Sequence, residues 1–211
     1  MKIRYAMKSR PGEQNENGDC IRMKEKDGAW LFAASDGCGS PGCGRIASET
    51  AVGSLIGRFE WNRGNEHFLR DAMLSSRDAV LCRQASDIRL NDISASVTAL
   101  LLEDDMASWA NAGSTRLYYF RRSALAGGAM SHGVSPLHLF HLTEGVQVHR
   151  GDSFLLCSDG FWKNIEEEQI GMIRKNAVTP VQWLRRMSDV VRQNGEGKNM
   201  DNYSAICVLL E

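Results

Sequence analysis

The same short pattern occurs twice in this chain: a run of apolar residues that ends in Ser-Asp-Gly. It closes residues 29–37 (AWLFAASDG) and again residues 153–160 (SFLLCSDG). Such a run predicts a buried β-strand, because it is short, continuous and bounded by turn residues. Each strand would therefore deliver one aspartate, Asp36 or Asp159, to the edge of a sheet. The glycine that follows leaves room for a close approach of the backbone.

Apolar periodicity predicts the remaining elements in an order typical of α+β proteins. The expected strands are 2–7, 20–26, 29–35, 94–104, 106–113, 116–122, 153–158 and 203–210, and the expected helices are 44–59, 65–86, 166–176 and 180–193. The three strands between residues 94 and 122 predict a β-meander, and residues 123–143, which contain several Gly and His residues, predict a loop. Antiparallel runs of strands with helices grouped between them favour a layered α+β domain over a doubly wound parallel sheet.

Charge and apolar content argue against several classes of function. The chain of 211 residues carries 25 Lys and Arg against 26 Asp and Glu, so no charge excess predicts binding to nucleic acid or to a membrane surface. No apolar run reaches the roughly 18 residues of a membrane span, and the N-terminal residues include no signal-peptide core. We therefore expect one domain over residues 1–211, located in the cytoplasm. Its six scattered cysteines are expected to be free thiols.

Two further acids accompany Asp36 and Asp159. Asp201 stands just before the last predicted strand, and Glu16 lies in the turn between the first two strands. If the sheets bring these strand ends together, the carboxylates share one small volume, where like charges resist ionisation. A hard divalent cation relieves that repulsion, and an all-oxygen ligand set suits Mg²⁺ or Mn²⁺ better than Zn²⁺. The pattern alone leaves open that each Asp-Gly is only a turn.

Two other interpretations of the stretch GCGSPGCGR, residues 37–45, have less support. A phosphate-binding P-loop requires Gly-Lys-Ser/Thr at its end, and Arg45 does not replace that lysine at the required spacing. A zinc site built on Cys38 and Cys43 requires a second pair of ligands, and the five histidines show no recognisable zinc-site spacing.

Six motifs, in this order, resemble those of the protein phosphatase type 2C family, the metal-dependent Ser/Thr phosphatases. They are NEN (15–17), SDGCGSPGCGRIAS (35–48), SASVTALLL (94–102), ANAGSTRLYYF (110–120), GDSFLLCSDGFW (151–162) and DNYSAICVLL (201–210). The resemblance implies a four-layer αββα sandwich, two antiparallel β-sheets flanked by helices. The compact form resembles bacterial members, which implies a phosphorylated protein substrate and a Ser/Thr kinase that the enzyme opposes.

The resemblance also implies roles for individual residues. Asp36, Asp159 and Asp201 would be the catalytic aspartates of a centre with two Mn²⁺ or Mg²⁺ ions. Asp36 would bridge both ions, the Gly37 carbonyl would add a ligand, and Glu16 would act through a bound water. Such a pair of ions lowers the pKa of a bridging water, so that hydroxide attacks the phosphorus of phosphoserine or phosphothreonine.

Some positions depart from the family pattern. Asn17 replaces the second acid of an Asn-Glu-Asp motif, and Asp19 is close enough in sequence to compensate. The phosphate-binding arginine of the family falls on Gly12. Arg10 is the nearest substitute, and Asn202 is the second candidate for a phosphate contact.

Other departures concern an accessory third metal. Ser114 and Lys163 stand where the resemblance places its acids, so we expect two ions and no third site. Cys38 stands where some members have a histidine proposed to protonate the leaving group. These losses leave an alternative function, a catalytically weak or inactive pseudophosphatase that binds phosphoproteins as a regulatory module. The intact aspartates favour an active enzyme.

Overall fold

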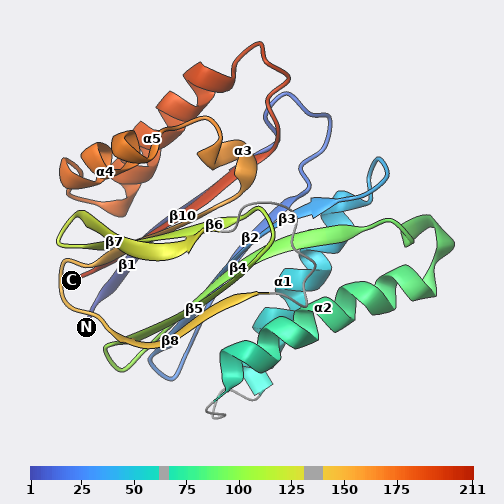
Figure 1. Cartoon of the computed structure of the whole chain (residues 1–211), viewed down its shortest axis with the longest axis horizontal. Coiled ribbons are helices and arrows are strands. Elements are labelled where there is room, and N and C mark those ends of the chain that lie inside the picture. Colours follow the sequence, from blue (N-terminus) through green and yellow to red (C-terminus); the bar gives the residue numbers. More distant parts are fainter. Residues whose placement is uncertain (62–66, 131–139) are drawn as a thin grey trace.

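The computed structural model describes residues 1–61, 67–130 and 140–211, and two five-stranded antiparallel sheets form its centre (Figure 1). The strand order of the first sheet is β1 (Ile3–Arg10), β10 (Tyr203–Leu210), β9 (Ser153–Cys157), β6 (Arg116–Arg121) and β7 (Ala124–Met130). The order of the second is β2 (Asp19–Lys26), β3 (Ala29–Cys38), β4 (Ser94–Glu103), β5 (Met106–Ala112) and β8 (His141–Gln147).

Helices cover the outer face of each sheet (Figure 1). The second sheet is covered by α1 (Gly44–Trp61) and α2 (Phe68–Ser86), and the first by α4 (Glu167–Lys175) and α5 (Pro180–Gly195). The order helix, sheet, sheet, helix confirms the predicted αββα sandwich. Two short helical elements were not predicted, the 3-10 helix η1 (Ile88–Leu90) and the single turn α3 (Asp159–Trp162). The predicted start of α2 at residue 65 lies outside the described residues.

Helix α5 illustrates how local sequence specifies these elements. The side chain of Thr179 accepts a hydrogen bond from the backbone N–H of Gln182 at 3.1 Å, and Pro180 occupies the first turn, where its missing N–H costs nothing. Side chains at helical spacing form the buried face against the first sheet: Trp183, Leu184, Met187 and Val191. None of the helices among the described residues combines the length and apolar character that crossing a bilayer requires.

The predicted β-meander is wrong at its third strand. β4 and β5 form the expected hairpin, but β6 pairs with β9 in the other sheet. On β6, Leu117 and Tyr119 face the core between the sheets, whereas Tyr118 and Phe120 face the core beneath α4 and α5. A strand buried on both faces is apolar throughout and fits the centre of either sheet, so its sequence does not decide which sheet it joins.

Residues 123–143 do not form the continuous loop that was predicted. They include β7 and the start of β8, while residues 131–139 lie outside the described part. β7 contains two glycines, which lower the strand propensity. Its pairing places Gly127 opposite Tyr119 and Gly128 opposite Tyr118. Tertiary pairing with β6 therefore overrides the local preference of this segment.

A buried polar network joins the two sheets where the chain passes from β5 to β6. Nδ2 of Asn111 donates to Oγ1 of Thr98 at 2.6 Å and to the carbonyl of Thr115 at 2.5 Å. The Thr98 hydroxyl in turn donates to Oγ1 of Thr115 at 2.7 Å. All three residues are fully buried, and such bonds gain strength from the low local dielectric. All six cysteines are free, as predicted.

Candidate metal centre

The first Ser-Asp-Gly copy, at the end of β3, places Asp36 beside a second acid. In the β2–β3 register Asp19 pairs with Asp36. Asp19 is only 1% exposed, and among the described residues its Oδ1 has no hydrogen-bond partner. The Ser158 hydroxyl donates to its other oxygen, Oδ2, at 2.7 Å. A buried carboxyl with one unpartnered oxygen is unfavourable unless a proton or a cation joins it.

The second Ser-Asp-Gly copy supplies Asp159 from the other sheet. β9 ends at Cys157, and Asp159 is the first residue of α3. Between them, Ser158 accepts a hydrogen bond from the backbone N–H of Ser204 at 2.9 Å, which ties this turn to β10. The Asp159 carboxyl lies within hydrogen-bonding reach of Asp36. The two copies of the motif therefore meet across the space between the sheets.

Burial and nearby negative charge raise the pKa values of two of these carboxyls, Asp36 and Asp19. Burial, followed by the negative charges of Asp19 and Asp159, raises the pKa of Asp36 to about 8. Burial also raises the pKa of Asp19 to about 6, although the nearby Ser204 and Ser158 hydroxyls oppose the change. Without a cation, the cluster therefore retains a proton at neutral pH. A divalent ion can take the place of that proton and remove the repulsion.

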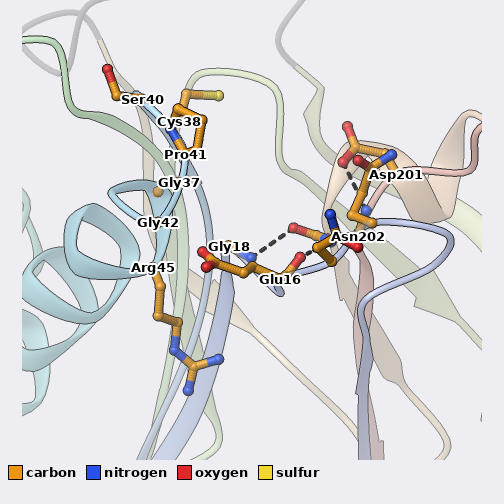
Figure 2. A pocket seen from close by; sticks show the side chains of 14 residues that line it. Glu16, Gly18, Gly37, Cys38, Ser40, Pro41, Gly42, Arg45, Asp201 and Asn202 are labelled. Atoms are coloured by element: carbon orange, nitrogen blue, oxygen red, sulfur yellow. Dashed lines mark hydrogen bonds between the residues drawn. The ribbon is translucent and has the colours of Figure 1, made fainter.

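A cavity of about 480 Å³ is lined by Gly37, the residue that follows Asp36. Its lining comes from the β1–β2 turn, the glycine-rich loop after β3 and the turn before β10 (Figure 2). Glu16 and Asp201 both line it and are exposed. Figure 2 shows the Glu16 carboxylate directed toward the glycine-rich loop, close to Gly42. The fold thus brings Glu16, Gly37 and Asp201, all predicted ligands, to one cavity.

The carbonyl oxygen of Gly37 is left uncovered by two neighbouring glycines. A Cβ atom at Gly44 would lie 2.4 Å from that oxygen, and a Cβ atom at Gly18 would lie 2.8 Å from it. Gly37 itself has no room for a side chain, because its Cβ would lie 1.9 Å from the Gly44 carbonyl oxygen. Side chains at these positions would fill the space that the predicted carbonyl ligand needs.

Arg10, the first predicted phosphate contact, does not line the cavity. It is exposed, and its guanidinium donates to the carbonyl of Ser9 at 3.2 Å. The family's own position for this arginine cannot hold a side chain here. Gly12 has φ +64°, and a Cβ atom there would lie 2.2 Å from the carbonyl oxygen of Asp201. Phosphate binding by Arg10 stays a prediction.

Asn202, the second predicted phosphate contact, lines the cavity but holds the β1–β2 turn. Its Oδ1 accepts from the backbone N–H of Gly18 at 2.6 Å, and its Nδ2 donates to the carbonyl of Glu16 at 2.8 Å (Figure 2). Its Nδ2 also donates to the carbonyl of Pro11 at 2.8 Å. These bonds give Asn202 a positioning role for Glu16. Phosphate binding by Asn202 stays a prediction.

Ser114 and Lys163 stand where the family resemblance places the acids of an accessory metal. Both lie at the edge of the carboxylate cluster. Nζ of Lys163 lies 2.7 Å from Oδ2 of Asp159. The Ser114 hydroxyl shares a hydrogen bond of 3.1 Å with Ser96, and the Ser114 carbonyl accepts from Nε1 of Trp162 at 2.8 Å. The hydrogen bond to Asp159 raises the pKa of Lys163. A fixed positive charge therefore stands beside Asp159.

The donor atoms at this edge fit a hard divalent cation. They are oxygens: the carboxylates of Asp19, Asp36, Asp159 and Asp201 and the carbonyl of Gly37. Within the described ranges, no three Asp, Glu, His or Cys side chains converge at the spacing that a bound ion imposes.

Comparison with known families assigns the chain to one of them. The family model described as protein phosphatase 2C matches residues 8–126, which is more than half of the chain. The chain belongs to the protein phosphatase 2C family. A comparison with curated proteins finds no match.

The solved structures similar to this protein phosphatase 2C family member include several bacterial phosphatases. The Mycobacterium tuberculosis serine/threonine phosphatase PstP/Ppp is 19% identical over 99% of both chains, with a TM-score of 0.83. Stp1, a serine/threonine phosphatase from Staphylococcus aureus, is 15% identical over 100% of this chain and 96% of its own, also with a TM-score of 0.83. A structure of the PstP catalytic domain in complex with two manganese ions is 19% identical over 99% of this chain and 98% of its own, with a TM-score of 0.79. At these identities the likeness shows a shared fold.

Two residues at the centre of this phosphatase-family site were not among the predicted ligands. Asp19 was expected only as compensation for Asn17, and Ser158 was not singled out. Both carry a signal in the sequence. Asp19 directly precedes the predicted strand 20–26, much as Asp201 stands just before the predicted strand 203–210. Ser158 is the serine of the second Ser-Asp-Gly copy. Their contact joins two sheets, which local spacing does not reveal.

The cysteines near this centre are not activated nucleophiles. Partial burial of the sulfur, and then the negative charge of Asp36, raises the pKa of Cys38 to about 11. Burial raises the pKa of the Cys157 thiol as well. A nucleophilic cysteine requires a lowered pKa. The chemistry of the candidate metal centre therefore depends on its oxygen ligands.

Proposed function

We propose that this protein hydrolyses phosphoserine and phosphothreonine in proteins at a two-metal centre. The observation that carries the proposal is the meeting of Asp36, Asp159 and Asp19 from two different sheets, in which the pKa of Asp36 rises to about 8. Such a cluster destabilises the folded state unless its carboxylates bind a cation. Membership of the protein phosphatase 2C family names the reaction that uses such a cation.

In the proposal, each residue has one role at the centre. Asp36 would hold both ions, Asp159 and Asp201 would hold one of them, the Gly37 carbonyl would add a ligand, and Glu16 would act through a bound water. When bound, two Mn²⁺ or Mg²⁺ ions supply a nucleophilic hydroxide at neutral pH and neutralise charge on the phosphoryl oxygens.

Ser158 helps to position these ligands. Its hydroxyl bonds Asp19 while its backbone leads directly into Asp159, so it fixes the distance between carboxyls of the two sheets. Asn202 holds Glu16 at the mouth of the cavity through the Glu16 carbonyl.

The proposal treats residues 1–211 as one phosphatase domain that acts in the cytoplasm on phosphoproteins and opposes a Ser/Thr kinase. Support comes from the similarity to PstP and Stp1, both named serine/threonine phosphatases. The cavity beside Asp36 is lined by exposed loops, which suits a phosphorylated side chain presented on a protein surface.

A regulatory module without activity is the alternative, and one observation favours it. The Lys163 ammonium occupies a carboxylate oxygen of Asp159 that a metal ion would also use. An ammonium at this place opposes the binding of a further cation.

The deciding experiment is phosphate release from p-nitrophenyl phosphate and from a phosphothreonine peptide, titrated with Mn²⁺ and with Mg²⁺. We expect metal-dependent turnover that Asp36→Ala abolishes. Asp78→Ala, which removes an exposed carboxylate on α2, is the matched control and should behave as wild type. A folded protein with no turnover at any metal concentration would contradict the proposal and favour the regulatory module.

A further inference from the structure

Lys163 is a cationic side chain that reaches the carboxylate cluster. Its Nζ lies 2.7 Å from Oδ2 of Asp159, and it is close enough for the charges of Asp201 and Asp36 to act on it as well. The contact is local in origin, because Lys163 follows Asp159 by four residues across the single turn of α3. The backbone therefore holds this ammonium at the candidate metal centre.

Two other cationic side chains near the cavity beside Gly37, those of Arg45 and Arg10, are hydrogen-bonded to other groups. Nε of Arg45 bonds Glu49 at 2.7 Å, and its Nη1 donates to the carbonyls of Asn17 and Asp19 at 3.4 and 3.3 Å. Figure 2 shows its side chain running away from the glycine-rich loop. The Arg10 guanidinium donates to the carbonyl of Ser9 at 3.2 Å.

The surroundings of Lys163 leave it open to a ligand. Its side chain is 57% exposed although it is paired with Asp159. It also lines a second cavity, of about 680 Å³, whose other lining residues are Trp162, Arg116, Ile165 and three acids, Glu166, Glu167 and Glu168. The Arg116 guanidinium stacks on the Trp162 ring at 3.4 Å, and Nζ of Lys163 lies 5.7 Å from the same ring. Lys163 thus stands between the carboxylate cluster and an open surface cavity.

We propose that Lys163 binds the phosphate group of the substrate. The proposal rests on the proposed phosphatase function, which it deepens by naming the residue that holds the anion. An ammonium has three N–H donors, so Lys163 can keep its bond to Asp159 and still donate to a phosphate oxygen on its exposed side. Its charge also compensates for Gly12, where an arginine side chain has no room.

The test compares Lys163→Met with Lys163→Arg, and uses Lys175→Met, an exposed lysine at the end of α4, as the matched control. The probe is inorganic phosphate, titrated by calorimetry into the Mn²⁺-loaded protein. We expect Lys163→Met to weaken phosphate binding about tenfold or more, the usual effect of losing a charge-assisted hydrogen bond. Lys163→Arg keeps a positive charge that can bind phosphate and should stay within about threefold of wild type. Lys175→Met should match the wild type.

Kinetics with p-nitrophenyl phosphate give the second readout. Lys163→Met should raise KM by the same factor as the phosphate affinity falls, with a smaller change in kcat. Unchanged phosphate affinity in Lys163→Met would overturn the proposal. So would a lower kcat with unchanged KM and phosphate affinity, because Lys163 would then only position Asp159.

Failure of the proposed function is distinguishable from failure of this inference. Wild-type protein without turnover contradicts the phosphatase assignment, while the calorimetric comparison still decides whether Lys163 holds phosphate. If Lys163→Met does not fold, Lys163→Gln keeps a polar side chain without the charge and is judged by the same phosphate titration.

Discussion

The hydroxyl of Ser158 donates a hydrogen bond of 2.7 Å to Oδ2 of Asp19, across 139 residues of chain. Ser158 belongs to the turn after β9 in the first sheet, and Asp19 begins β2 in the second. The same hydroxyl accepts the backbone N–H of Ser204 at 2.9 Å. One small side chain therefore joins three strands at the candidate metal centre, and its neighbour in sequence is Asp159.

Replacing Ser158 tests this connection. Ser158→Ala leaves Oδ2 of Asp19 and the N–H of Ser204 without a partner, so we expect the free energy of unfolding to fall by about 1–3 kcal/mol. Mn²⁺ affinity should fall about 10–100-fold, because the supporting hydrogen bond of a ligand cluster is lost. Urea denaturation in chelator and a Mn²⁺ titration measure the two effects.

A matched control for that change is available on α5. Ser188 is equally buried, but its hydroxyl has no hydrogen-bond partner among the described residues. Ser188→Ala should therefore leave both stability and Mn²⁺ affinity close to wild type. Equal Mn²⁺ affinity in Ser158→Ala and Ser188→Ala would show that Ser158 does not support the centre.

The stability of the metal-free protein should fall as the pH rises. Asp36 has its pKa raised to about 8 and Asp19 to about 6, so the folded state holds protons that the unfolded chain releases near pH 4. This contribution is complete below the unfolded pKa and is lost as the pH passes through about 8. Thermal unfolding in chelator between pH 6 and 9 should show a declining Tm.

The Asp36→Asn variant separates this effect from other titrations. It removes the carboxyl with the most strongly raised pKa and should flatten the decline. Saturating Mn²⁺ should also flatten it in the wild type, because the cation replaces the proton. A wild-type Tm that is constant or rises over this range would contradict the raised pKa values.

Gly12 should not tolerate any side chain. A Cβ atom there would lie 2.2 Å from the carbonyl oxygen of Asp201 and 2.5 Å from that of Met200, and φ is +64°. We expect Gly12→Ala to cost more than about 1–2 kcal/mol of stability and to weaken Mn²⁺ binding by displacing Asp201. Gly12→Arg should lower phosphatase activity further, although it restores the residue type typical of the family.

Gly28 provides the comparison for Gly12. It has a similar conformation, φ +82°, but nothing lies within 4 Å of the position of its Cβ. Gly28→Ala therefore reports the cost of the backbone conformation alone, about 1 kcal/mol, with unchanged Mn²⁺ affinity. If denaturation and Mn²⁺ titration give the same values for Gly12→Ala and Gly28→Ala, the close approach of the Asp201 backbone has no energetic consequence.

The polar network between the sheets should be essential for stability. Asn111→Ala removes the donor that bonds Thr98 and the Thr115 carbonyl, and leaves both buried acceptors with fewer partners. We expect a loss of about 2–3 kcal/mol in the free energy of unfolding. Asn176→Ala, which removes an exposed amide after α4, should cost much less in the same denaturation experiment. Similar losses in both variants would contradict this role.

Much of the site could be predicted because its residues follow strands that can be recognised from the local sequence. The apolar runs of β3 and β9 end at or near Asp36 and Asp159, and local burial patterns report such runs directly. The helices α4 and α5 also agree closely with prediction, since their caps and apolar faces are local features. The order of the motifs along the chain was sufficient to indicate the family.

Only the tertiary structure decided how these segments meet. The assignment of β6 to the first sheet, the strand β7 opposite two tyrosines, and the bond between Ser158 and Asp19 all join residues through pairings that no local pattern encodes. The physical reason is that periodicity reports which side chains are buried, while the partner that buries them is chosen by the packing of the whole chain. The sequence determined which carboxylates end the strands, and packing of the two sheets decided that they share one site.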